Sequence, residues 1–189
     1  MQRCTWVNQD PLYIAYHDDE WGVPVHDSQK LFEKLCLEGQ QAGLSWITVL
    51  KKRETYRQCF HQFDPHKVAA MTEADVDRLM QNPGLIRHRG KLEAIINNAK
   101  IYLDMEKNGE SFADFIWSFV NHAPIVNHFS LNGENTLPAS TPTSDAMAKA
   151  LKKRGFKFVG TTICYAYMQS MGLVNDHMIE CFCHPDNRS

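Results

Sequence analysis

Two side chains in this sequence could do chemistry, the carboxylate of Glu38 and the indole of Trp46. A corner that contains glycine lies between them. Glu38 precedes Trp46, and Gly39 and Gly43 enclose the polar run between them. Glycine permits positive φ and a close approach to another molecule, so we expect a tight, exposed corner. A carboxylate beside an aromatic ring can hold a planar ligand by stacking and one polar contact. The alternative is a solvated acid at a helix end and a tryptophan in the core.

A second candidate site combines thiols and imidazoles from the two ends of the sequence. If the C-terminal segment is helical, His177 and Cys181 share one face of the helix, whereas Cys183 points elsewhere. Cys4 and His17 are the clearest candidates for the two further ligands that a closed tetrahedral zinc site requires. Such a site would be structural, because four protein ligands leave no position for a reactive water. The alternative is a set of inert buried cysteines, since these spacings do not match a compact zinc finger.

A third candidate site is the connection between two expected helices within residues 72–108. Unpaired backbone N–H groups and the helix dipole at the start of the second helix would favour an anion there. Cationic side chains add reach, so we expect this segment to hold DNA phosphates without reading bases. An ordinary helical hairpin with a polar turn is the alternative, and its glycines lie further apart than in the usual glycine-x-glycine hairpin. The candidate DNA-binding residues are Gly84, Arg87, Arg89, Gly90 and Lys91.

The helices that must position these residues are indicated by capping residues and by apolar spacing. Apolar residues recur at three-and-four spacing after Ser28, which predicts a buried helix that leads into Glu38. Residues 1–27 are expected to form an irregular aromatic arm with at most short helices, and residues 123–142 a long loop. No segment alternates with period two, so we predict an all-α fold. The other expected helices start at or next to Ser45, Asp64, Thr72, Gly90, Ser111, Ser144 and Gly160.

Length and composition are those of one soluble unit. The chain has 189 residues, of which 43% are hydrophobic and 22% charged, and a net charge of −2. We therefore expect residues 1–189 to fold as a single unit with a sizeable core. No apolar run is long enough to span a bilayer, and the N-terminus lacks the apolar core of a secretory signal. The six cysteines are then expected to stay reduced in the cytoplasm, which favours metal ligation over disulfides.

Several motifs occur in the same order as in 3-methyladenine DNA glycosylase I of bacteria, which the sequence resembles over nearly its whole length. The resemblance rests on the opening Cys4-Thr5-Trp6, residues 11–22, residues 37–46, and residues 175–177 with Cys181. It implies a helix-hairpin-helix DNA glycosylase fold with the hairpin near residues 72–108.

The resemblance also implies one structural zinc per chain, joining the terminal segments 1–27 and 172–189. The implied ligands are the four considered above, namely Cys4, His17, His177 and Cys181. The base pocket implied by the resemblance holds Glu38, with Tyr13, Tyr16 and Trp46 as aromatic walls.

The implied function is base-excision repair, in which the N-glycosidic bond of 3-methyladenine in alkylated double-stranded DNA is hydrolysed after base flipping, without strand cleavage. The family is described as lacking the catalytic aspartate of related glycosylases, which is reasonable because an adenine alkylated at N3 is cationic and leaves as a neutral base. Glu38 is then the candidate catalytic residue, either by accepting a hydrogen bond from the adenine amine or by acid–base or electrostatic catalysis. Gly43 and Leu44 would contact DNA, with Leu44 filling the vacated stack. We expect a cytoplasmic bacterial monomer.

Two other classes of function compete with this interpretation. A zinc-stabilised DNA-binding module without chemistry would retain the basic hairpin but release no base from methylated DNA. A thiol-based redox enzyme or metal hydrolase would use Cys181 or Cys183, but the sequence has no Cys-x-x-Cys motif and no open three-ligand site.

Overall fold

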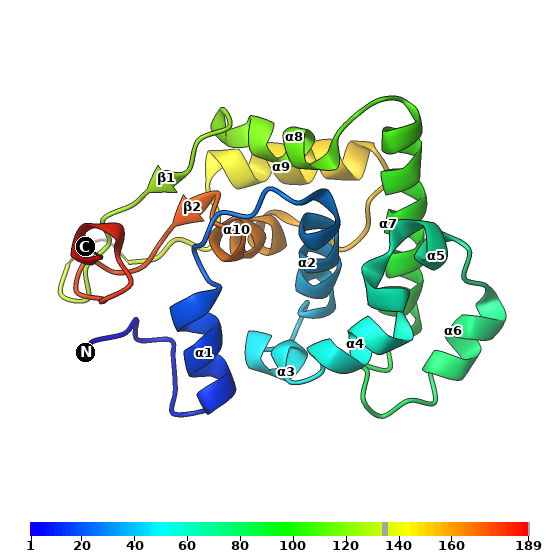
Figure 1. Cartoon of the computed structure of the whole chain (residues 1–189), viewed down its shortest axis with the longest axis horizontal. Coiled ribbons are helices and arrows are strands. Elements are labelled where there is room, and N and C mark those ends of the chain that lie inside the picture. Colours follow the sequence, from blue (N-terminus) through cyan, green and yellow to red (C-terminus); the bar gives the residue numbers. More distant parts are fainter. Residues whose placement is uncertain (134–135, 189) are drawn as a thin grey trace.

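Helix α2, Ser28–Gln40, forms the buried centre of the molecule, and the other long helices surround it (Figure 1). The computed structural model describes residues 1–133 and 136–188. α2 packs against α7, Arg89–Lys107, and against α10, Thr161–Ser170. Its apolar stripe is fully enclosed, as the three-and-four spacing predicted, and Glu38 near its C-terminal end is also buried.

The remaining helices connect these three. α1 is Pro11–Asp19, and α2 is followed by α3, Trp46–Leu50, and α4, Arg53–Cys59. α5, Pro65–Ala69, and α6, Glu73–Leu79, come before α7. α8, Phe112–Trp117, and α9, Pro142–Lys153, come before α10. Single 3-10 turns lie at η1, His61–Phe63, at η2, Ser118–Val120, and at η3, Pro185–Asn187.

Local chemistry explains most of the helix starts, and several predicted caps are confirmed. The Asp64 side chain accepts hydrogen bonds at the start of α5, where Pro65 occupies the first helical position. Thr72 and Asp75 form the predicted capping box of α6. Ser111 caps α8 through the backbone N–H of Asp114.

Two predicted caps are displaced. α2 is capped by Asp27, whose carboxylate accepts from the N–H of Lys30, whereas the hydroxyl of Ser28 accepts from Ala113 and ties α2 to α8. α9 begins at Pro142 with Thr141 as its cap, and Ser144 is the third residue of that capping box. In both cases another cap stands before the predicted one, so the helix starts earlier.

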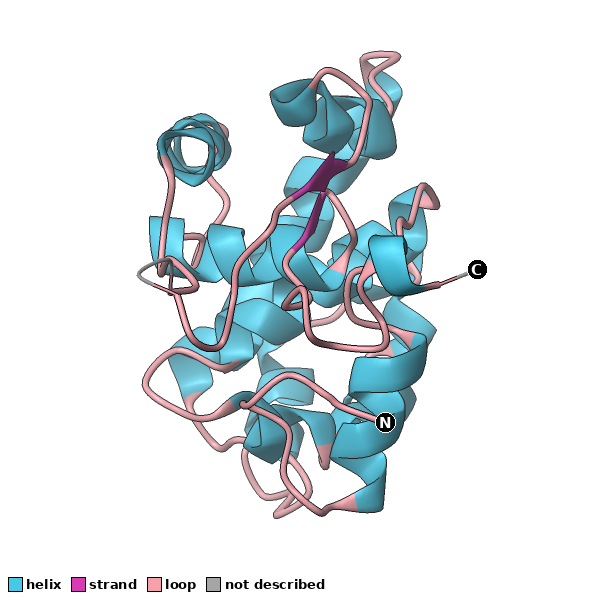
Figure 2. Cartoon of the chain, turned by 90° about the vertical axis from the view of Figure 1, so that its left-hand side faces the viewer, coloured by secondary structure: helices cyan, strands magenta, loops and turns pink. Residues whose placement is uncertain are grey.

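The prediction of a strictly all-α chain is wrong in one detail, and the fold is mostly helical. Strand β1, Ile125–Val126, pairs in parallel with β2, Val174–Asn175 (Figure 2). Strands of two residues are too short to produce an alternating pattern in the sequence. β1 lies inside the loop predicted over residues 123–142, and positions 134–135 of that loop lie outside the described residues.

The two ends of the chain meet on one side of the molecule (Figure 1). The backbone N–H of Phe182 donates to the carbonyl of Gln2 at 2.9 Å, and buried residues from Cys4 to Cys183 belong to one hydrophobic core. The predicted aromatic arm contains one regular element, α1, because Asp10 caps it and Pro11 fits its first turn. Within the described ranges, every helix is too short or too polar to cross a membrane.

Candidate functional site

A cavity of about 170 Å³ lies where the end of α2 meets α1, α3 and α10. The four residues that the sequence placed in a base pocket, Tyr13, Tyr16, Glu38 and Trp46, all line it. They come from three different helices, and only the packing of α1 and α3 against α2 brings them together. The complete lining is Trp6, Tyr13, Tyr16, Trp21, Glu38, Gln41, Trp46, Leu137, Ala166 and Gln169.

Sequence reasoning did not assign six of these residues to the pocket. Trp6 has its ring centroid 5.1 Å from that of Tyr13 and 5.0 Å from that of Trp21, so the arm supplies a continuous aromatic wall. The density of aromatic residues in 1–27 was a signal that could have found both tryptophans. Leu137 carries no comparable signal, because it reaches the cavity only through the path of its loop.

Glu38 is a buried acid that keeps one oxygen for the cavity. The residue is 2% exposed, and among the described residues its Oε2 has no hydrogen-bond partner. Burial raises the pKa of this carboxyl above its ordinary value, and the nearby ammonium of Lys34 opposes that rise. An unpaired acceptor in a buried position is costly unless a ligand supplies the donor.

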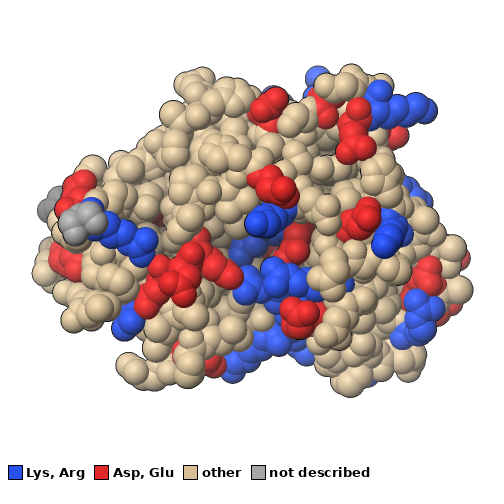
Figure 3. All heavy atoms as spheres, in the orientation of Figure 1, with Lys and Arg blue, Asp and Glu red and all other residues tan. Residues whose placement is uncertain are grey.

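The larger hollow of the molecule does not contain this acid. It is a groove of about 670 Å³ on the other side of Tyr16 and Lys34, lined mainly by charged side chains. Two of its arginines are paired, Arg53 with Glu20 and Arg57 with Glu33. Figure 3 shows acidic and basic side chains mixed in the middle of one face, so that face offers no field of a single sign. The smaller aromatic cavity is therefore the better candidate for a planar ligand.

The turn between α2 and α3 presents Gly43 and Leu44 at the surface. Gly43 has φ +78°, the left-handed conformation that glycine adopts without strain, and Leu44 is 42% exposed. Gln41 and Trp46, on either side of this turn in the sequence, both line the cavity. The turn thus stands at the rim of the cavity with an exposed apolar side chain at its tip.

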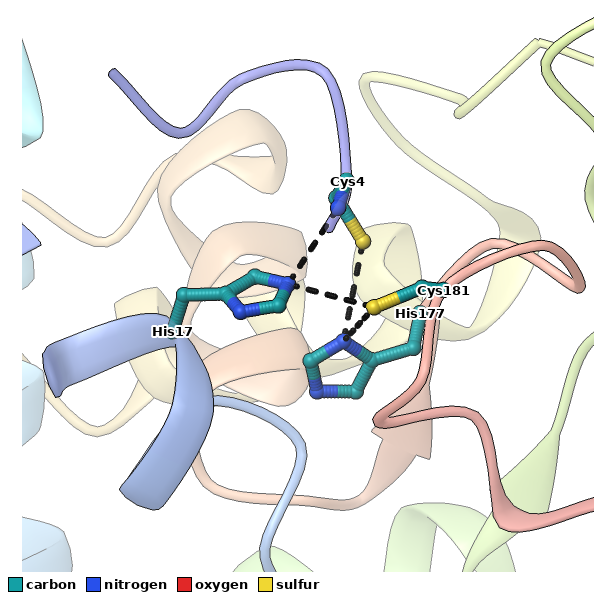
Figure 4. A group of neighbouring side chains, drawn as sticks. All are labelled: Cys4, His17, His177 and Cys181. Atoms are coloured by element: carbon teal, nitrogen blue, oxygen red, sulfur yellow. Dashed lines mark hydrogen bonds between the residues drawn. The ribbon is translucent and has the colours of Figure 1, made fainter. Parts of the chain in front are cut away.

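The four predicted metal ligands converge at the meeting point of the termini (Figure 4). One donor atom from each of Cys4, His17, His177 and Cys181 lies within 4.8 Å of the other three, and all four residues are buried. The Sγ of Cys4 and the Sγ of Cys181 are each 3.6 Å from Nδ1 of His177, and Cys181 Sγ is 3.5 Å from Nε2 of His17.

Both imidazoles are oriented by a second contact. Nδ1 of His17 is bonded to the carboxylate of Asp18 at 2.7 Å, and Nε2 of His177 to the carbonyl of Trp21 at 2.8 Å. The opposite nitrogen of each ring consequently faces the two sulfurs. The hydrogen bond from Cys4, followed by those from the histidines, lowers the pKa of Cys181 well below its ordinary value.

The ligand set was predicted on the condition that the C-terminal segment is helical, and the structure shows that this segment is not a helix. Residues 176–184 form a loop of turns, and a hydrogen bond of 2.8 Å from the N–H of Cys181 to the carbonyl of Met178 closes the turn that brings Cys181 beside His177. Cys183 does point elsewhere, as expected: its sulfur accepts from the guanidinium of Arg188 at 3.0 Å.

The connection between α6 and α7 contains the other predicted DNA-binding residues. Gly84 approaches α4 so closely that a Cβ there would lie 2.7 Å from Cγ2 of Thr55. Arg87 is exposed, and the described residues offer its guanidinium no ion-pair partner. Arg89 pairs with Asp77 and Glu93. Gly90 stands in the first turn of α7.

Lys91 is not a surface cation, which corrects the expectation for this residue. It is 6% exposed, and its Nζ donates to the carbonyl of Gln40 at 2.9 Å and to that of Ala42 at 2.6 Å. The side chain of Gln40 in turn donates to the carbonyl of Lys91. α7 begins at Arg89 and packs against α2, so its third residue faces inward and fixes the start of the Gly43 turn.

Comparisons with known proteins agree on one family. A family model described as methyladenine glycosylase matches residues 6–184. The chain is 70% identical to DNA-3-methyladenine glycosylase 1 of Escherichia coli strain K12, over 100% of both chains. A crystal structure of 3-methyladenine DNA glycosylase I superposes with a TM-score of 0.95 at 71% identity, covering 97% of this chain and 100% of the other.

A second solved structure is more distant in sequence but similar in fold. The 3-methyladenine DNA glycosylase I of Staphylococcus aureus, whose structure concerns the recognition of 3-methyladenine, gives a TM-score of 0.92 at 42% identity, covering 98% of this chain and 97% of the other. The family match and the full-length identity leave one conclusion: this chain belongs to the methyladenine glycosylase family.

Proposed function

We propose that this chain is a base-excision repair glycosylase that hydrolyses the N-glycosidic bond of 3-methyladenine in alkylated DNA. The observation that carries the proposal is the unpaired Oε2 of Glu38 in a buried cavity whose other lining is largely aromatic. Aromatic walls hold any flat base by stacking, and a single acceptor can then select a base that has an amine. The names of the relatives state the same activity.

The chemistry asks little of a general acid. An adenine alkylated at N3 carries a positive charge, so when the C1′–N9 bond breaks the electron pair moves to N9 and the base leaves neutral. Water then adds to C1′ of the sugar, and the phosphate backbone stays intact. The main tasks of the protein are to take the nucleotide out of the stack and hold the base while the bond breaks.

Glu38 performs the recognition step in this proposal. A carboxylate is an acceptor only, so its Oε2 can accept from the exocyclic amine of adenine and would repel the carbonyl oxygen of guanine. Tyr13, Tyr16 and Trp46 stack on the base. The indole N–H groups of Trp6 and Trp46 are buried and without partners among the described residues, so they are further donors available to a ligand.

DNA is held by two surface segments. Gly43 and Leu44 stand at the cavity rim, where Leu44 fills the space that the flipped nucleotide leaves in the stack. The α6–α7 hairpin binds the phosphate backbone of duplex DNA through Gly84, Arg87, Arg89 and Gly90. This phosphate-binding role is supported by the start of α7, where the N–H groups of the first helical turn lie beside the exposed Arg87. Lys91 acts from the interior by holding the Gly43 turn.

The Cys4, His17, His177 and Cys181 centre holds one structural zinc in this proposal. Tetrahedral zinc with bonds of about 2.3 Å to sulfur and about 2.05 Å to nitrogen separates sulfur from nitrogen by about 3.6 Å. The Sγ–N separations here are 3.5 and 3.6 Å, so the donors fit the ion. Zinc at this point would join segments 1–27 and 172–189 and would leave no position for water. We further propose that the chain forms a single folded unit that acts as a monomer in the bacterial cytoplasm.

The decisive experiment is an assay of base release. Incubation of the protein with methylated duplex DNA should liberate free 3-methyladenine, identified by chromatography, and leave the strands uncut until the abasic sites are cleaved chemically. A DNA-binding module without chemistry would retain the duplex and liberate nothing. Release of other bases with equal efficiency would reject the recognition role of the pocket.

A further inference from the structure

Lys34 lies directly behind the aromatic cavity, although it does not line it. It belongs to α2, one turn before Glu38, and it is 5% exposed. Tyr16 borders both the cavity and the larger charged groove, and Lys34 borders only the groove. The ammonium group therefore forms part of the wall between the two hollows.

This one cation contacts three groups that line the cavity. Nζ of Lys34 donates to the hydroxyl of Tyr16 at 2.7 Å and lies 3.6 Å from Oε1 of Glu38. It also lies 3.6 Å from the centroid of the Trp46 ring, within the range of a cation–π contact. The two aromatic rings are themselves 5.6 Å apart, so the ammonium holds them as a pair.

Stability alone does not account for a cation in this position. Moving an ammonium out of water costs several kcal/mol, and a well-packed apolar side chain of similar volume often stabilises a protein more than a buried ion pair does. What the pair does provide is geometry. With Oε1 of Glu38 directed to Lys34, the other oxygen, Oε2, is left without a partner among the described residues.

We propose that Lys34 is a positioning residue for base recognition, which orients Glu38, Tyr16 and Trp46 from behind and keeps the Glu38 carboxylate ionised. The inference rests on the proposed function and adds a residue to it. Lys34 itself does not touch the base. Its ammonium balances the charge of Glu38, so the pocket can keep a carboxylate acceptor in apolar surroundings without protonating it.

The titration of the pair supports this role. Burial raises the pKa of Glu38, and Lys34 is the largest influence that lowers it, so removal of the cation should raise the pKa further. Burial lowers the pKa of Lys34 to about 8. The other charged groups that face the ammonium are Glu20 and its ion-pair partner Arg53, while Tyr13, Tyr16 and Tyr167 are titratable hydroxyls near Glu38.

The test compares two substitutions on the same helix. Lys34→Met keeps most of the length of the side chain and removes the charge. Lys30→Met removes the same charge one turn earlier, where the side chain is exposed. Binding of free 3-methyladenine, measured by tryptophan fluorescence and by calorimetry, should weaken roughly 10- to 100-fold at pH 7 in Lys34→Met, the amount lost with a hydrogen bond to a charged group. Lys30→Met should bind as the parent protein does.

A pH series separates positioning from packing. In Lys34→Met the protonated Glu38 should lose its proton as the pH rises and so become an acceptor again. The affinity for free 3-methyladenine should therefore increase toward higher pH by more than it changes in the parent protein. A uniform loss at all pH values would show a packing defect and overturn the proposal. If Lys34→Met does not fold, the same pH series is measured on Lys34→Gln, which keeps a donor for the Tyr16 hydroxyl but carries no charge.

A double-mutant cycle with Glu38→Gln completes the test. If Lys34 acts mainly through Glu38, the double variant should lose less affinity than the sum of the two single losses, whereas fully additive losses would overturn the proposal. The outcome is separable from the proposed function. A parent protein that releases no 3-methyladenine from methylated DNA rejects the function, and an active parent with an unchanged Lys34→Met profile rejects only the role of Lys34.

Discussion

Glu38 combines a deep position with an oxygen that no described residue satisfies. If Glu38 served only to end a helix, a solvated acid would be sufficient. Burial of its charge would then cost free energy without any benefit. The arrangement is useful when a ligand brings the missing donor. In the proposed function, Glu38 therefore selects a base that offers an amine to Oε2 among bases that all stack equally well.

Replacement of Glu38 by alanine should abolish selection together with binding. We expect Glu38→Ala to weaken binding of free 3-methyladenine by roughly 10-fold or more and to reduce base release in parallel, because one hydrogen bond to a charged acceptor is lost. Trp46→Ala should weaken stacking while keeping the preference for a base with an amine. Normal binding of the free base by Glu38→Ala, combined with lost turnover, would instead make Glu38 an acid–base or electrostatic catalyst.

Two connections act as elements rather than as single side chains. The turn after α2 presents Leu44 at the cavity rim, and the α6–α7 hairpin presents Arg87 beside the start of α7. A buried network joins them. The N–H of Ile86 donates to the hydroxyl of Tyr56, which donates to Gln40, and the side chains of Gln40 and Lys91 are bonded to each other's backbone carbonyls. The two connections are thereby tied to each other by hydrogen bonds.

The turn is tested by removing its apolar tip. We expect Leu44→Ala to bind duplex DNA with an abasic analogue roughly 10-fold more weakly, because the buried part of a leucine contributes about 1.5–3 kcal/mol. Binding of free 3-methyladenine should not change. Leu12→Ala is the matched control, since that leucine is 40% exposed on α1 and Leu44 is 42% exposed. Equal effects of the two substitutions would reject the plug role.

The hairpin is tested through its dependence on salt. Arg87→Ala should reduce the slope of log affinity against log salt by about 1 and weaken binding similarly on unrelated sequences, as expected for one phosphate contact. Arg89→Ala should have a smaller effect, because its guanidinium is already paired with Asp77 and Glu93. A changed sequence preference with an unchanged slope would mean that the hairpin reads bases.

At the scale of the whole molecule, the Cys/His centre joins the first and last segments of the chain and also supports the pocket. The segment tied down by Cys4 and His17 carries four of the aromatic residues that line the cavity, namely Trp6, Tyr13, Tyr16 and Trp21. We therefore expect stability and ligand binding to be coupled, although the cavity and the proposed zinc site are separate. With a net charge of only −2, the molecule does not attract DNA through its overall field, and local groups must provide the attraction.

Loss of the proposed zinc should loosen both termini. We expect Cys181→Ala to contain no zinc by metal analysis and to melt roughly 10 °C lower, which corresponds to about 3 kcal/mol at about 2–4 °C per kcal/mol. Amide hydrogen exchange should rise in residues 1–20 and 175–188. Cys183→Ala is the control and should keep its zinc, because that sulfur contacts Arg188. Equal zinc content in the two variants would refute this ligand set.

Local sequence patterns were enough to predict most of the helices and the chemical character of the candidate residues. Apolar spacing gave α2 and α7, and local hydrogen-bond chemistry gave the starts of α5, α6 and α8, since those signals act within one helical turn. The types and spacing of the cysteines and histidines already suggested the ligand set, which the resemblance also implies, and the resemblance added the walls of the pocket. In the structure the four ligands form a buried centre and the pocket residues line a cavity. The functional roles of both sets stay proposals.

Only the tertiary structure decided which residues are neighbours and which way their side chains point. Lys91 looked like a surface cation beside two arginines, but the packing of α7 against α2 turns it inward. The sequence predicted no role for Lys34, and it lies under the pocket because α1 and α3 close over that side of α2. Leu137 enters the cavity from a loop without a motif. Such placements depend on contacts between segments far apart in the sequence, which local patterns do not encode.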